Sequence, residues 1–323
     1  MKQQQFEETN LKFWEQFLFQ LNNSSSKNTQ SNSKWDANEF AQNYRKLCHH
    51  LSLAKERKYS EQLVTHLTKI TNQGHQKLYR GKGISLMNLI SGLFIVFPQS
   101  LRQQAFWFWT STAICLVPAI IVYLSVIIFP DSIYLFVNPI QVSDIEQMYQ
   151  PSAHVVGEFR DSESNLEMFA HYINNNISID FRIYASGLTF GVLTIFFLLL
   201  NSILFGALSA HMQNEQLHET FFGFVSGHAA FELIAMIIAG AAGLQLAAAL
   251  IAPKQHTRFK ALELSAKKTF PLIYGAAFMT LIAAFIEAFW SSGNIVSFEN
   301  KLAFGALMFV LVVAYLSLAG RKK

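Results

Sequence analysis

Long apolar runs, separated by more polar stretches, occupy the last two thirds of this sequence. Four of them are long enough to cross the hydrocarbon core of a bilayer, which takes about 20 helical residues. They are Phe106 to Phe129, Ile183 to Leu208, Phe270 to Trp290 and Leu302 to Leu318. Trp107, Trp109 and Trp290 lie at the ends of these runs, where aromatic side chains favour the membrane interface. The pattern predicts an all-α fold, a polytopic transmembrane helix bundle.

A fifth apolar run, Phe221 to Ile251, is too long for one upright span. As a single helix it would extend about 46 Å, whereas the bilayer core is about 30 Å thick. Two interpretations are open. The run either bends at Gly240-Ala-Ala-Gly243 and returns as a re-entrant hairpin, or it forms one long tilted helix.

The distribution of charge favours the hairpin. The segment at about 130–181 is rich in Asp and Glu and is predicted to be an external loop. Basic residues flank the membrane region at its N-terminal side, after Ile251 and in the C-terminal tail, which predicts that all three are cytosolic. Arg258 is interpreted as a cytosolic anchor. A single crossing between Phe221 and Ile251 would place the later basic segments outside, and a hairpin would remove this conflict.

The N-terminal third has a different pattern, with apolar stripes at helical spacing on otherwise polar segments. It predicts three amphipathic helices, at Phe6 to Leu21, around Phe40 to Ala54 and from about Ser60 to Tyr79. Asn22 to Ser33 is interpreted as a flexible linker, and Ile84 to Phe97 as an interfacial helix. The predicted domains are therefore 1–104, a cytosolic helical region, and 105–323, a transmembrane domain.

Composition supports this picture, since 51% of residues are hydrophobic and only 14% are charged. Soluble domains carry about 25% charged residues. The net charge of +4 is small and spread out, which argues against nucleic-acid binding. The two cysteines, Cys48 and Cys115, show no disulfide or zinc pattern. The N-terminus lacks a secretory signal, so we expect internal segments to direct insertion into the cytoplasmic membrane.

A few ionisable or amide residues interrupt the apolar runs: His228, Glu232, Glu287 and Asn201. His228 and Glu232 are four residues apart and share one face of a helix. Such groups are costly in a bilayer, and they either form a working site or make a buried hydrogen bond that fixes helix register. The functional interpretation is a proton relay, an ion site or a substrate contact.

Two further sets of residues have more than one interpretation. His211, Glu215, His218 and Glu219 are spaced for a metal ion, but no second set of ligands is evident, so no metal or other cofactor is predicted. Gly187, Gly191, Gly240 and Gly243 allow either close helix packing or a hinge. Nucleotide-binding and hydrolase motifs are missing from the sequence, which predicts a protein that is not an enzyme.

Several stretches resemble the stage II sporulation protein M family. They include Met168 to Ile177, Phe224 to Leu233, Ala239 to Leu244 and Ala284 to Trp290, with Tyr44 to Leu47 and Gly74 to Arg80 upstream. The resemblance implies a non-catalytic membrane scaffold, because the namesake recruits peptidoglycan-degrading enzymes. It also implies envelope partners such as MoxR-type ATPases or RDD-type membrane proteins. Apart from the resemblance, membrane lipids are expected partners, and whether copies of the chain form an oligomer is left open. The alternative is a proton-linked transporter or channel.

Overall fold

The computed structural model describes residues 2–23, 37–79, 86–151, 162–293 and 296–321. In these ranges all regular structure is helical, as predicted. The chain forms two compact units, Met1–Ser85 and Leu86–Lys323, each with its own core. Most of the linker predicted at Asn22 to Ser33 lies outside the described residues, and Asn22 itself belongs to the first helix.

The first unit contains α1 (Gln3–Asn23), α2 (Ala37–Glu56) and α3 (Glu61–Tyr79). Their apolar stripes meet in one core, in which Trp14, Phe17 and Leu67 are fully buried. Trp14 Nε1 donates a hydrogen bond to Nδ1 of the buried His50 over 3.1 Å. Burial lowers the pKa of His50, and the charge of Lys46 acts in the same direction.

The second unit begins with a helical segment made of α4 (Leu86–Ser91), a π-helical turn (Gly92–Val96) and α5 (Phe97–Gln103). Phe97 and Leu101 are buried against α11 and α12, while other apolar side chains of the segment, such as Met87 and Ile90, are exposed. This segment, with both buried and exposed apolar side chains, includes the described part of the helix predicted at Ile84 to Phe97. It packs with the second unit, so the unit boundary at Ser85 precedes the domain boundary predicted at residue 104.

Five described helices are long and apolar enough to cross a membrane. They are α6 (Ala105–Ile128), α9 (Val192–Asn214), α10 (His218–Ile251), α11 (Arg258–Ile286, extended by a π-helical turn at Glu287–Ser291) and α12 (Phe298–Leu318). The chain is therefore a multi-pass membrane protein.

The second predicted span began too early. Helix α8 (Ser162–Ala185) ends inside the apolar run, and the chain reverses through a 3₁₀ turn at Ser186–Thr189. Phe190 and Gly191 both have positive φ, at 56° and 84°. Hydropathy alone could not reveal this reversal, because both sides of the turn are apolar.

The re-entrant hairpin was also wrong. Helix α10 is one continuous helix of 34 residues, and Gly240 and Gly243 are buried within it without interrupting it. A Cβ on Gly240 would lie 2.8 Å from Leu198 of α9, and one on Gly243 would lie 2.8 Å from the carbonyl oxygen of Ile183. The small residues therefore let neighbouring helices approach α10 closely.

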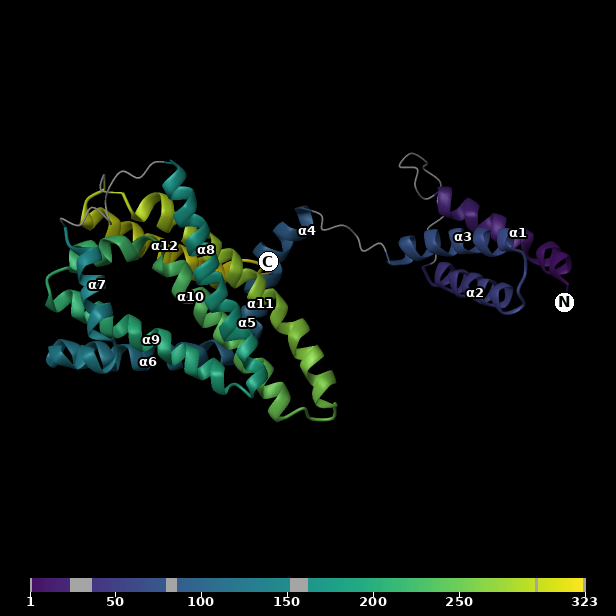
Figure 1. Cartoon of the computed structure of the whole chain (residues 1–323). Coiled ribbons are helices and arrows are strands. Elements are labelled where there is room, and N and C mark those ends of the chain that lie inside the picture. Colours follow the sequence, from purple (N-terminus) through teal and green to yellow (C-terminus); the bar gives the residue numbers. More distant parts are fainter. Residues whose placement is uncertain (1, 24–36, 80–85, 152–161, 294–295, 322–323) are drawn as a thin grey trace. The chain divides into compact units, whose positions relative to one another are not determined.

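The acidic segment at 130–181 is not a simple loop. It contains a 3₁₀ turn (Pro130–Leu135), α7 (Pro139–Tyr149) and most of α8. Helix α8 packs along α10 and α11 (Figure 1). Its contacts with α11 run antiparallel: Phe169 with Phe289, Asp180 with Thr280, and Tyr184 with Thr269. Helix α8 thus carries the chain back along the bundle, although its composition is too polar for a candidate span.

This return path brings the basic segments to one end of the second unit. Arg102 donates to the carbonyl oxygens of Leu316 and Ala319 at the end of α12. Trp107, at the start of α6, lines one groove with Pro253 and Lys254 of the α10–α11 connection. We call this the basic end; it holds Arg102, Lys254, Arg258 and Arg321.

The opposite end holds acidic residues. Asn214, at the end of α9, donates to the carbonyl oxygen of Val126 near the end of α6, and Glu146 of α7 contacts His211. We call this the acidic end; it includes residues 129–149 and 215–219. Because α8 also runs from the acidic end to the basic end, the basic segments before α6, after α10 and after α12 all lie at one end although α10 is a single helix. The hairpin in α10 is therefore not needed to explain the distribution of charge.

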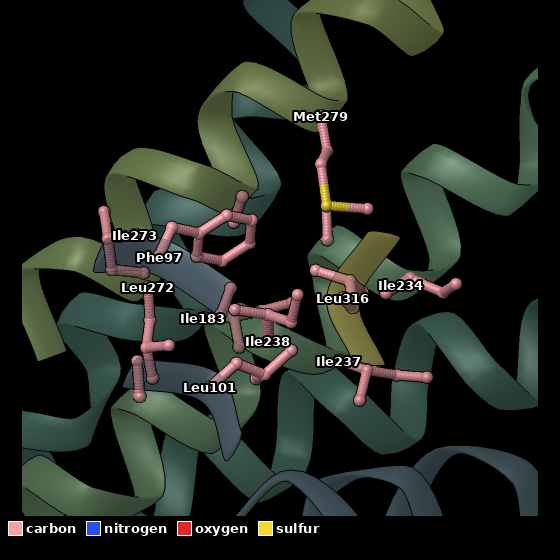
Figure 2. Packing of buried hydrophobic residues seen from close by; sticks show 14 of the residues in the cluster. Phe97, Leu101, Ile183, Ile234, Ile237, Ile238, Leu272, Ile273, Met279 and Leu316 are labelled. Atoms are coloured by element: carbon pink, nitrogen blue, oxygen red, sulfur yellow. The ribbon is translucent and has the colours of Figure 1, made fainter. Parts of the chain in front are cut away.

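The core of the second unit lies where α10 meets α5, α8, α11 and α12. Figure 2 shows Phe97, Ile183, Ile238, Leu272 and their neighbours interlocked at this position. Every residue of α10 from Ile237 to Gly243 is buried. Central placement of α10 explains why its polar residues face other helices.

Candidate functional site

Three of the four predicted intramembrane polar residues converge. The ligand atoms of His228, Glu232 and Glu287 all lie within 4.8 Å of one another. His228 and Glu287 are buried, with 4% and 7% exposure, while the Glu232 side chain is about one-third exposed. We call these three residues the His–Glu–Glu cluster.

Local helix geometry positions each member. His228 and Glu232 lie one turn apart on α10, so both face α11. Glu287 is the first residue of the π-helical turn that follows α11, and Ser291 is its last. π-Helical turns occur often at functional sites, because the extra residue redirects side chains. Gly227 provides space for the indole of Trp290, which a Cβ at residue 227 would overlap.

The hydrogen bonds around the cluster are asymmetric. His228 Nδ1 lies 3.2 Å from Ser291 Oγ, whereas His228 Nε2 lies 3.9 Å from Glu232 Oε2, too far for a hydrogen bond. Glu287 Oε2 is buried and has no hydrogen-bond partner among the described residues. Lys301 of α12 directs its ammonium to the carbonyl oxygen of Ser291 over 3.0 Å.

A third carboxyl group, that of the buried Asp180 of α8, was missed as a site residue because it was counted with the charges of the acidic segment. Its Oδ2 accepts a hydrogen bond of 2.5 Å from Thr280 of α11, and it lies near enough to sense the charge of Glu232. A sequence signal exists: Ile173, Asn176, Asp180 and Ile183 recur at helical spacing, and the last three are buried.

Asn201 lies elsewhere. Its amide donates to the carbonyl oxygen of Phe197 over 2.7 Å. It lines a groove of about 310 Å³ between α8 and α9, together with Asn174, Asn175, Ser178 and Arg182. The guanidinium of Arg182 lies 5.9 Å from the ring centre of Phe197. We call this polar surface the α8–α9 groove.

The other predicted residues have separate surroundings. His211 faces Glu146 of α7, while the ring of His218 faces Phe298, so the two histidines do not share a site. Arg258 is exposed in the first turn of α11, at the basic end. Gly191 adopts positive φ at the α8–α9 reversal, and a Cβ there would lie 2.9 Å from Ala247 Cβ.

Comparison with known proteins agrees with the sequence resemblance over the membrane region. Residues 105–292 match the family described as Stage II sporulation protein M. Residues 4–80 match a separate domain of unknown function, DUF8413, so the first unit lies outside the family region. No curated protein and no solved structure matches the chain. Because the family match covers more than half of the sequence and includes the His–Glu–Glu cluster, the chain belongs to the stage II sporulation protein M family.

Proposed function

We propose that the protein is a non-catalytic scaffold of the cell envelope, which assembles with other membrane proteins. The observation that carries this proposal is the α8–α9 groove. Asn174, Asn175, Ser178 and Arg182 are exposed on a helix that packs along the candidate spans. Asn201, on the groove wall, is in the middle of α9, far from either end of that span.

Lipid chains cannot satisfy these groups. An amide or guanidinium exposed to hydrocarbon loses its hydrogen bonds to water and gains none in return, which costs several kcal/mol by order of magnitude. A partner helix that carries amide or carboxylate groups would satisfy the asparagines, and its carboxylate would neutralise Arg182. The groove therefore fits a protein partner within the membrane, and such a partner would make the chain part of a complex.

The family resemblance suggests which partners to examine first. An RDD-type membrane protein could occupy the α8–α9 groove, and a MoxR-type ATPase could bind the three-helix first unit. Peptidoglycan remodelling is the process that the family namesake suggests. We also propose that the basic end faces the cytosol, because basic residues are retained on that side of the membrane.

Site-specific crosslinking tests the scaffold proposal. A photoreactive residue replaces Ser178 in the groove, and Val310 of α12, which is 62% exposed, serves as the lipid-facing control. We expect a discrete protein adduct from position 178 and lipid adducts from position 310. Asn175→Leu should abolish the protein adduct. The same adduct pattern at both positions would contradict the proposal.

A proton-linked transporter or channel is the second candidate, favoured by the convergence of the His–Glu–Glu cluster. Reconstituted protein containing a trapped pH dye would then show proton flux that Glu232→Gln removes. Flux that is equal in protein-free vesicles would exclude this candidate.

A further inference from the structure

We propose that His228, Glu232 and Glu287 bind one divalent transition-metal ion, with Zn²⁺ as the first choice. These residues offer one imidazole nitrogen and two carboxylates from α10 and the turn after α11. Neutral imidazole and carboxylate are common zinc ligands, and three protein ligands with one open position are typical of reactive zinc sites. The sequence had placed all three residues among the candidate intramembrane polar residues, but it could not show that Glu287, 55 residues after Glu232, meets the other two.

The unpaired acceptor points to a ligand. Glu287 is more than nine-tenths buried, yet its Oε2 has no hydrogen-bond partner among the described residues. A buried acceptor without a partner is unfavourable by itself. Since Oε2 belongs to a carboxylate within 4.8 Å of two other ligand groups, an ion between them would satisfy it directly.

The contacts of His228 leave one nitrogen for the ion. With its proton on Nδ1, the imidazole donates to Ser291 Oγ, and the lone pair of Nε2 then faces Glu232. Histidine ligands commonly donate their second ring N–H to a neighbouring acceptor, which fixes both the tautomer and the ring orientation. Ser291 is therefore a positioning residue for the proposed ligand.

The charges also match. Two carboxylates this close together in a water-poor site repel each other, and a bound cation would relieve this repulsion while both stay ionised. Lys301 contacts the Ser291 carbonyl oxygen, and Asp180, beside Glu232, adds a further acidic group. Tyr149 of α7 lies near Glu287 and contributes an uncharged phenol. A doubly charged ion would balance Glu232 and Glu287 together.

Small movements would form the site. Tetrahedral zinc with bonds of about 2.0 Å holds its ligand atoms about 3.3 Å apart. The separations of up to 4.8 Å must therefore shorten by about 1.5 Å at most. Rotation of the Glu232 side chain, which is only partly buried, supplies such a movement and leaves a route for the ion and a fourth ligand.

Metal analysis of the full-length protein tests the proposal. The chain is purified in detergent with a tag that contains no histidine, exposed in turn to Zn²⁺, Mn²⁺ and Co²⁺, and desalted. We expect about one Zn²⁺ per chain by mass spectrometry, and Co²⁺ absorption bands that Zn²⁺ displaces. His228→Asn, which keeps a donor toward Ser291, and Glu287→Gln should each reduce bound metal at least tenfold.

Two matched variants separate metal loss from misfolding. Ser291→Ala should retain the ligands and weaken affinity about 10- to 100-fold, as expected when a hydrogen bond to a histidine ligand is removed. His211→Gln alters a buried histidine outside the cluster and should leave the stoichiometry unchanged.

If monodisperse wild-type protein retains none of the three metals, the proposal is overturned. The carboxyl groups of the cluster would then bind protons and no metal ion. Equal metal content in wild type and Glu287→Gln would overturn it as well. Neither result would affect the crosslinking test of the α8–α9 groove, so the two proposals fail independently.

Discussion

The backbone at Gly187, in the α8–α9 reversal, lies directly against the carbonyl group of Gly243 in the centre of α10. A Cβ on Gly187 would overlap that carbonyl oxygen and would lie 2.9 Å from its carbon. The obstacle is main chain inside a continuous buried helix and cannot rotate away. The contact fixes the point at which α8 ends and α9 begins relative to α10.

Gly187→Ala should therefore destabilise the membrane unit, by about 1–3 kcal/mol for an overpacked position. The thermal unfolding temperature in detergent measures the effect. Gly223→Ala in α10 is the control, since its Cβ would lie 3.5 Å from the Phe298 ring, an ordinary contact. An unchanged unfolding temperature for Gly187→Ala would show that this packing is wrong.

The arrangement of six helices along the bundle predicts which segments share a side of the membrane. After replacement of Cys48 and Cys115 by alanine, His256→Cys probes the basic end and Ser143→Cys the acidic end. We expect a membrane-impermeant maleimide to label position 143 in intact spheroplasts, and position 256 only after permeabilisation. Labelling of both positions from one side would contradict the traverse by α8.

The buried His50 leads us to expect that the free energy of unfolding of the first unit decreases at acidic pH. Because burial places the folded-state pKa below the ordinary value of 6.5, the unfolded chain binds the proton more readily. Stability is therefore complete above pH 6.5 and falls as the pH decreases from 6.5 toward the folded-state pKa. Protonation of Nδ1 would also remove the acceptor of the Trp14 hydrogen bond.

Hydrogen exchange of α1–α3 in the whole protein, corrected for intrinsic rates, measures this effect between pH 7.5 and 5.5. His50→Gln should reduce the pH dependence. His66→Gln, at an exposed position of the same unit, should not change it. Equal pH dependence in wild type and His50→Gln would refute the assignment.

The side chain of Arg102 joins α5 to the end of α12 through two hydrogen bonds. Its two terminal nitrogens donate to Leu316 and Ala319 carbonyl oxygens over 2.6 and 2.7 Å. Arg102→Lys cannot make both bonds in this geometry and should cost about 1–2 kcal/mol, since the site is only partly buried. Faster trypsin cleavage at Arg321 would report the loosened tail, and Arg45→Lys in the first unit is the control.

Much of the candidate site could be predicted from local spacing. His228 and Glu232 were recognisable because two polar residues one helical turn apart interrupt an apolar run. Glu287 was recognisable for the same reason within its own span. Their convergence was not, since it depends on how α11 packs on α10 and on the π-helical turn at its end.

The sequence by itself determined the all-helical class, the apolar spans and the three-helix N-terminal region, because hydrophobic periodicity and length are local properties of the chain. Only the tertiary structure decided that α10 is unbroken and that α8 returns along the bundle. Helix α8 is too polar to be recognised as a traverse. Its Asn176 and Asp180 are tolerated because α8 packs against α10 and α11, where Thr280 satisfies the carboxyl group. The hydropathy of α8 alone does not show that residues of α10 and α11, distant in the sequence, bury and hydrogen-bond its polar side chains.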